Sequence, residues 1–254
     1  MTAETRSDGA HAQLLVRHLR TTLSRVGFDL VQPLQIGWYN GVVDGALRLE
    51  DFGSSQNLAI VIGNTRALWP KLLGRLQVDP ALRAALHPIE QYTEECIAPP
   101  VSALGVPASV RWSHDVGERL VAMQRLAQIA GLAYLSESHL SVHPSYGPWI
   151  ALRAAVTFDV CADAIAKVEL SHPCGSCEAH CSPAFERAVS AGGEPRDAAD
   201  IRANFPLWLA VRDACPAGRA YRYDDAQILY HYLADREQLL AAAGIPSGPD
   251  PIHS

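Results

Sequence analysis

The spacing of apolar residues along the chain predicts a succession of helices and short strands. Leu15, Leu19 and Leu23 recur every four positions, which predicts an amphipathic helix over residues 12–27 that ends at Gly27. The same spacing predicts further helices over residues 66–76, 87–98, 117–133 and about 225–243. Thr65 is the expected N-cap of the first of these, and Asp224 or Asp225 that of the last.

Apolar runs bounded by turn residues predict the strands. They fall at residues 34–40 (a strand and turn), 57–62, 108–112, 139–142 and 149–158. The last two are expected to pair through a turn at 143–148, which contains Pro and Gly. Because helices and strands do not alternate regularly, we expect an α+β fold with an antiparallel sheet.

The chain divides into three parts by composition. Residues 1–10 are expected to be disordered, residues 11–159 to form an α+β core, and residues 160–254 to form a C-terminal helical segment packed on that core. This last part holds most of the cysteines and the final helix.

Composition and charge exclude several classes of function. The chain has 254 residues, of which 48% are hydrophobic, and a net charge of −6 without a long run of either sign. A basic face for nucleic acid is therefore not expected. No apolar run approaches the roughly 18 residues of a membrane span, and the polar N-terminus carries no secretion signal, so we expect a cytoplasmic protein. Neither a dinucleotide or phosphate-binding glycine motif nor a nucleophile elbow is present.

Three sets of residues could carry chemistry. The turn from His143 to Trp149 offers free backbone groups and the flat side chains of Tyr146 and Trp149, with Arg153 further along the strand; alternatively, its aromatic residues fill the core. Arginine forks suit carboxylates. Arg212, Arg222 and Arg236 could thus bind an anion, or could pair with Asp213 and Asp235 at the surface.

The third set is the cysteine cluster. Its members are Cys174, Cys177 and Cys181, followed downstream by Cys215. A C-x2-C-x3-C run with a distant Cys-Pro resembles iron–sulfur ligation without the regular ferredoxin spacing. Zinc is the alternative, with His172 or His180 as a nitrogen ligand. Reduced thiols that hold no metal are the third interpretation.

Several segments together resemble a known family, the cobalamin-processing and trafficking proteins of the methylmalonic aciduria and homocystinuria type C kind. The segments follow the family's order and span most of residues 12–244: 34–40 (LQIGWYN), 58–62 (LAIVI), 87–91 (HPIEQ), 128–134 (QIAGLAY), 143–153 (HPSYGPWIALR) and Arg212-Asp-Ala. The W-Y-N and H-P-x-[FY]-G-x-W-x-A-x-R segments are the most specific.

The resemblance implies a flavin-reductase-like (nitroreductase-like) core that holds a base-off cobalamin. The family removes the upper ligand of cobalamin, either reductively with a flavin (FMN or FAD) or by transfer of an alkyl group to glutathione. By motif matching, the corrinoid would contact Gln128, Tyr134, His143, Pro144, Tyr146, Gly147 and Trp149. The matched glutathione-binding residues are Arg153, Arg212 and Arg236.

Two departures qualify the resemblance. Vertebrate members have a histidine where this chain has Gln128, which affects the expected corrinoid contacts. The cysteine cluster is absent from the vertebrate pattern and is more similar to the epoxyqueuosine reductases, which join a related core to a ferredoxin-like module. A [4Fe-4S] cluster at these cysteines could then supply electrons.

The expected function is therefore cobalamin binding with removal of its upper ligand, with glutathione or another electron donor as partner. The alternatives are an iron–sulfur or flavin-dependent reductase for another substrate, and a non-catalytic corrinoid carrier. The sequence leaves open whether the protein is a monomer or a homodimer.

Overall fold

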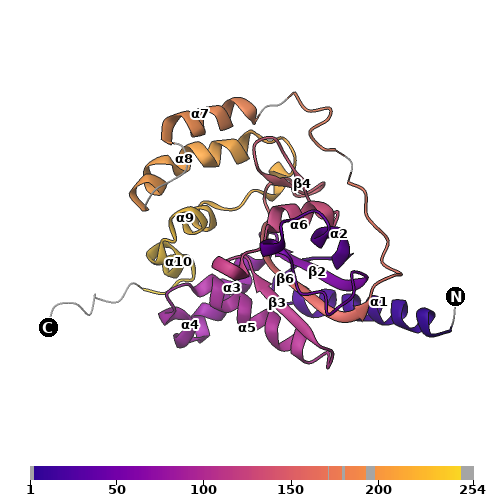
Figure 1. The fold of residues 1–254 in the computed structure, drawn as a ribbon. Helices are drawn as coiled ribbons and strands as arrows, with labels where there is room; N and C mark the ends of the chain where they lie inside the picture. The colour runs from indigo at the N-terminus through magenta and orange to yellow at the C-terminus, as the bar shows by residue number, and fades with distance from the viewer. Residues whose placement is uncertain (1–2, 171, 179–180, 193–197, 247–254) are drawn as a thin grey trace.

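The centre of the protein is a four-stranded antiparallel sheet with the strand order β1-β2-β6-β3 (Figure 1). The computed structural model describes residues 3–170, 172–178, 181–192 and 198–246. The strands of the sheet are β1 (Leu30–Gln35), β2 (Asn57–Asn64), β6 (Ala151–Cys161) and β3 (Ala108–Trp112). Two short strands, β4 (Tyr134–Leu135) and β5 (Ser141–Val142), form a separate hairpin. The expected α+β fold with an antiparallel sheet is confirmed.

Strand β2 is buried along its whole length because both faces of the sheet are covered. Its residues Leu58, Ile60 and Ile62 belong to one apolar cluster, together with residues of the helices α1 (Ala3–Ser24), α3 (Leu68–Val78) and α5 (Pro88–Ser102). The alternate residues Ala59 and Val61 belong to a second cluster with residues of the helices α2 (Ile36–Asn40) and α6 (Met123–Ile129). The apolar run NLAIVI, which predicted a buried strand, therefore serves both cores.

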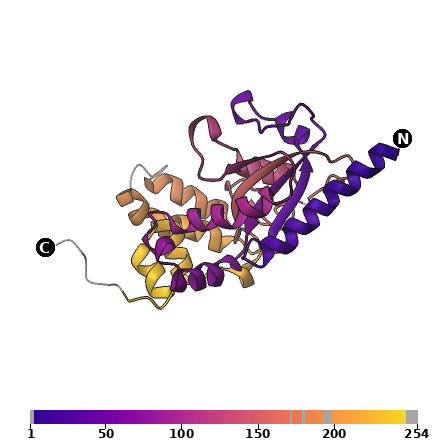
Figure 2. The same cartoon turned by 90° about the horizontal axis from the view of Figure 1, so that it is seen from below.

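The helices around the sheet follow the apolar pattern with shifts at their ends. Their bounds are α1 (Ala3–Ser24), α2 (Ile36–Asn40), α3 (Leu68–Val78), α4 (Pro80–Ala84), α5 (Pro88–Ser102) and α6 (Met123–Ile129). Short 3-10 turns lie at Gly45–Leu47, Gly117–Arg119 and Arg219–Tyr221. Seen from below, α1 runs along the sheet and its N-terminal end projects beyond the other elements (Figure 2).

The C-terminal part consists of two helix pairs. They are α7 (Ser182–Gly192) with α8 (Ala198–Ala214), and α9 (Asp225–Leu233) with α10 (Arg236–Ala242). Tyr230 of α9 and Leu239 of α10 join the same apolar cluster as α1 and β2. The second pair therefore packs on the core. Within the described residues, no helix has the length and apolar character that a membrane span requires.

The predicted pairing of 139–142 with 149–158 is wrong. Strand β5 pairs with β4, while β6 pairs with β2 on one side and with β3 on the other. Both edges of β6 are therefore occupied, which leaves no edge for residues 139–142. The turn closes on itself instead through an isolated bridge between His143 and Gly147.

Four element boundaries also differ from the pattern. The W-Y-N segment lies on α2, because the preceding strand already ends at Gln35. The long helix expected at 117–133 is a 3-10 turn followed by the short α6. The last helix is two helices that meet at Ala234, whose φ is 49°. Helix α1 begins at Ala3, inside the segment 1–10 that was expected to be disordered. The apolar pattern does not predict this first part of the helix, because it projects beyond the other elements and has no core to pack against.

Candidate functional site

The turn after β5 is held in shape by its own backbone and by one imidazole. The N–H groups of His143 and Gly147 each donate to the other residue's carbonyl, both at 2.9 Å. His143 Nδ1 accepts from the N–H groups of Ser145 at 3.0 Å and Tyr146 at 3.3 Å. Burial lowers the pKa of His143, so the ring stays neutral and can accept these bonds. Pro144 is exposed at the tip.

The segment that contains the β4–β5 hairpin and this turn borders three pockets. Tyr146 lines a pocket of about 790 Å³ together with Arg66 and Trp69. Residues 138–140 at the hairpin tip line a second pocket of about 670 Å³ with Trp208.

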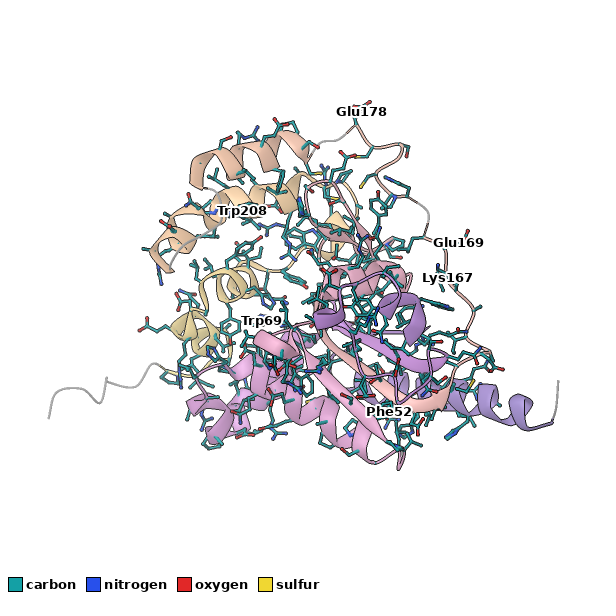
Figure 3. All side chains as sticks on the ribbon, in the orientation of Figure 1. Phe52, Trp69, Lys167, Glu169, Glu178 and Trp208 are labelled. Carbon is teal, nitrogen blue, oxygen red and sulfur yellow. The ribbon has the colours of Figure 1, made fainter. Side chains whose placement is uncertain are left out.

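Gln128 of α6 and Tyr134 of β4 line a third pocket of about 640 Å³ with Arg125 and Lys167. The labelled Lys167 lies on the segment after β6, which passes the outside of α6 (Figure 3). Gln128 and Tyr134 therefore share a pocket, but it is a different pocket from that of Tyr146.

Trp149 is nearly sealed from solvent and has an aromatic and cationic surrounding. Only 1% of it is exposed, and its ring lies 5.6 Å from that of Tyr223. The guanidinium carbon of Arg212 is 5.3 Å from the Trp149 ring centre, and that of Arg222 is 5.6 Å away. The Trp149 ring thus makes cation–π contacts with both arginines. It lines none of the three large pockets.

Arg153 is the centre of a buried polar group. Its Nε donates to Asn64 Oδ1 at 2.7 Å, while its Nη2 is buried and has no partner among the described residues. The buried hydroxyl of Tyr223 also lacks a partner within the described part of the chain. Burial raises the pKa of Tyr223 to about 12, and the nearby charges of Arg212 and Arg153 lower it only in part. Both groups are therefore hydrogen-bond donors for which the described residues supply no acceptor.

The three predicted anion-binding arginines, Arg153, Arg212 and Arg236, differ in their hydrogen-bond partners. Arg212 Nη2 donates to the carbonyls of Pro148 at 2.9 Å and Ile150 at 3.3 Å, and the side chain lines the pocket at the hairpin tip. Arg236 lies on α10, where it donates to the carbonyls of Arg83 and Ala85.

Each of two tyrosines lies close enough to two of these arginines for their charges to lower its pKa. Arg212 and Arg153 lower the pKa of Tyr223, and Arg153 and Arg236 lower that of Tyr230, in both cases against the larger raising effect of burial. Arg222, in contrast, forms ion pairs with Asp213 at 2.7 Å and Asp225 at 3.2 Å, in accord with the surface-pairing interpretation of that residue.

The cysteines of the cluster lie together. Cys174, Cys177, Cys181 and Cys215 line one small, enclosed cavity of about 30 Å³. Among the described residues, no group of three or more His, Cys, Asp or Glu side chains is arranged to hold a metal ion. His172 Nε2 is bonded to the Tyr134 hydroxyl, and His180 lies outside the described residues.

Sequence reasoning missed the residues that surround Arg153. Asn64 ends β2, Tyr223 lies just before α9 and His231 lies on α9, and no motif joins these distant positions. The alternation Tyr221-Arg222-Tyr223 drew attention only to its arginine. Its two tyrosines face different partners, since Tyr221 packs against Tyr146 at 4.7 Å whereas Tyr223 packs against Trp149.

The sequence is similar to that of two characterised proteins, although no protein-family model matches the chain. Cyanocobalamin reductase / alkylcobalamin dealkylase of Danio rerio is 28% identical over 164 residues, which cover 57% of this chain and 64% of the relative. The Homo sapiens protein of the same name is 25% identical over 160 residues, which cover 56% of each chain. The match thus spans less than two thirds of each relative's length.

Two solved structures have similar folds. The C. elegans B12-trafficking protein CblC matches with a TM-score of 0.67 and 18% identity, over 92% of this chain and 97% of the other. Epoxyqueuosine reductase from Bacillus subtilis matches with a TM-score of 0.52 and 11% identity, over 91% and 80%. The family resemblance seen in the sequence is therefore confirmed: this chain has the fold of CblC and is similar in sequence to cyanocobalamin reductase / alkylcobalamin dealkylase.

Proposed function

We propose that the protein binds cobalamin in its base-off form and removes the upper axial ligand. Removal proceeds by reduction or by transfer of the ligand to a thiol. One observation carries the proposal: residues 134–147 border three large pockets. This segment includes the start of the 143–153 motif, which is among the most specific resemblances to the cobalamin-processing proteins. A ligand the size of a corrinoid needs extended concave surface of this kind.

The pockets combine apolar side chains with polar and charged ones. Tyr146 and Trp69 provide flat apolar surface in the largest, while Gln128 and Tyr134 provide polar contacts in another. In this proposal Gln128 contacts the corrinoid where vertebrate relatives use a histidine. His143, Pro144 and Gly147 act by setting the position of Tyr146, and Trp149 acts by supporting Arg212.

The buried donors near Arg153 support a site for an anionic thiol such as glutathione. A carboxylate there would accept from Arg153 Nη2 and the Tyr223 hydroxyl, both of which lack an acceptor among the described residues. Arg212 and Arg236 would add positive charge, because each acts together with Arg153 on a neighbouring tyrosine. Holding the thiol beside the corrinoid makes a bimolecular attack local. For the reductive reaction we propose a reduced flavin, FMN or FAD, as electron donor.

Titration with hydroxocobalamin tests the proposal. Loss of the lower base on binding changes the visible spectrum, and we expect saturation at one corrinoid per chain. Gln128→Ala should weaken binding about tenfold, which corresponds to about 1.4 kcal/mol. The control is Gln91→Ala on α5, whose side chain bonds only to Glu95 in the structure and should leave binding unchanged. A wild-type spectrum that does not change would overturn the proposal.

Turnover then separates the remaining functions. Loss of the upper ligand with glutathione or reduced flavin is expected of an enzyme. Binding without turnover under either condition would instead indicate a corrinoid carrier. A reductase acting on another substrate would consume reduced flavin but would not respond to cobalamin.

A further inference from the structure

Four cysteines from separate segments surround one enclosed space. Cys174 and Cys177 lie on the loop before α7, Cys181 lies at the start of α7, and Cys215 follows α8. The rest of the wall comes from the β4–β5 hairpin and two prolines, namely Ser136, Ser138, Leu140, Val142, Pro173 and Pro216. Thiols from segments this far apart in sequence meet only because the loop folds back over the hairpin.

Hydrogen bonds orient the sulfur atoms within this arrangement. The Cys177 N–H donates to the Cys174 carbonyl at 3.1 Å, so the C-x-x-C segment forms a tight turn. The Ser138 hydroxyl donates to Cys181 Sγ at 3.4 Å, and the Ala217 N–H donates to the Cys215 sulfur. Donors aimed at sulfur stabilise thiolates, which are the form that binds metals.

The two kinds of metal centre differ in how their thiolate ligands are arranged. Zinc–sulfur bonds are about 2.3 Å long, so four thiolates around one zinc lie only about 4 Å apart. Within the described chain no three ligand side chains are arranged to hold one ion, yet all four cysteines line a cavity of about 30 Å³. An iron–sulfur cluster binds each thiolate through a different iron, so its four thiolates need not converge on one ion.

We propose that Cys174, Cys177, Cys181 and Cys215 ligate one iron–sulfur cluster of the [4Fe-4S] type. The enclosed wall of Leu140, Val142 and the two prolines protects it from water. His172 bonds through its Nε2 to the Tyr134 hydroxyl, and four thiolates are sufficient for the ligand set of a [4Fe-4S] cluster. This inference does not depend on cobalamin binding.

The cluster site adjoins the turn that borders the largest pocket. Ala217, two residues after Cys215, places its carbonyl against Gly147, where an added Cβ would lie 2.0 Å from the oxygen. Gly218 packs equally closely on the backbone of Tyr146. The cluster therefore also fixes the wall of the pocket that Tyr146 lines.

The full-length protein, purified without oxygen and reconstituted with iron and sulfide, tests the assignment. We expect about four iron and four acid-labile sulfide per chain, a broad visible absorption that dithionite bleaches, and an electron paramagnetic resonance signal after reduction. Cys177→Ala should lower bound iron at least fourfold. Cys161→Ala, whose sulfur lies outside the cavity, should retain it.

The wild-type protein alone distinguishes an iron–sulfur cluster from zinc and from metal-free thiols, through its iron and sulfide content and its electron paramagnetic resonance signal. The test therefore does not depend on whether the variant folds. One zinc per chain without sulfide would overturn the cluster, as would a protein that holds no metal after reconstitution. Iron that survives in Cys177→Ala at the wild-type level would overturn the ligand assignment.

Discussion

Arg153 is the residue whose surroundings say most about a ligand. A guanidinium nitrogen buried without an acceptor costs free energy, so its retention indicates that something else supplies the acceptor. The Tyr223 hydroxyl is in the same condition, and His231 lies close by with a pKa lowered well below its usual value by burial and then by Arg153 and Arg212. The neutral imidazole adds no positive charge, so the cationic groups that act on it are Arg153 and Arg212.

Replacing Arg153 with Ala should therefore impair thiol-dependent dealkylation. We expect a rise of at least tenfold in the KM for glutathione, because a charge-assisted bond to a buried group contributes about 1.5–3 kcal/mol. Hydroxocobalamin affinity should stay nearly unchanged. Arg119→Ala removes an exposed arginine paired with Asp115 and serves as the control. Thiol kinetics equal to wild type would rule out the assigned role.

His143 should make the turn sensitive to acid. The folded state holds the ring neutral through its acceptor Nδ1, so its pKa lies below the usual value of about 6.5. The unfolded chain takes up a proton first as the pH falls. The stabilisation is then complete above about pH 6.5 and is lost as the pH falls through the lowered folded pKa.

Thermal unfolding between pH 5 and 8 measures this effect. The melting temperature of the wild type should fall below about pH 6.5, and part of that fall should be absent in His143→Asn, whose amide oxygen can still accept. Identical pH profiles for the two proteins would show that another group is responsible.

At the scale of elements, two turns from distant parts of the chain are locked together. Gly147 and Gly218 have φ values of 57° and 71°, and an added Cβ on either would lie within about 2.1 Å of the other turn's backbone. Only glycine permits both the left-handed conformation and this approach. The contact joins the turn that carries Tyr146 to the one that follows Cys215.

Gly218→Ala should consequently destabilise the protein much more than Gly117→Ala. Gly117 also has a positive φ, 63°, but an added Cβ there meets nothing within 4 Å. Gly117→Ala should therefore lose only the roughly 1 kcal/mol of unfolding free energy that the conformational strain costs. The additional loss in Gly218→Ala measures the contact between the turns. Equal losses in denaturant unfolding would mean that the turns separate at little cost.

At the scale of the whole molecule, the last two helices belong to the main core. Leu239 is completely buried in the cluster that also holds α1 and β2, and Gln77 of α3 donates to the Ala243 carbonyl at 3.0 Å. The segment after residue 159 thus has no independent core for α9 and α10. Helices α7 and α8, in contrast, form a separate small cluster with Leu140 of the hairpin.

Leu239→Ala should lower the unfolding free energy of the entire protein by about 3 kcal/mol, through the cavity it leaves. The transition should remain a single one. The control is Leu86→Ala, at a position that is 84% exposed. It should change the unfolding free energy by less than about 0.5 kcal/mol. A separate early transition for the C-terminal helices, with an unchanged main transition, would contradict a shared core.

The sequence by itself determined the elements whose residues interact locally. The 57–62 and 108–112 strands, the N-cap at Asp224 and the helix stop at Gly27 are confirmed, because apolar period, capping and positive φ depend on near neighbours. It also indicated the antiparallel α+β class and the family resemblance.

Only the tertiary structure decided which elements meet. β6 takes both β2 and β3 as neighbours and leaves residues 139–142 to pair with β4, which no local pattern encodes. The surroundings of Arg153, the division of Gln128 and Tyr146 between two pockets, and the closure of Cys215 on the other cysteines likewise join residues distant in sequence. Long-range packing and burial set these contacts, and both depend on the whole chain being folded.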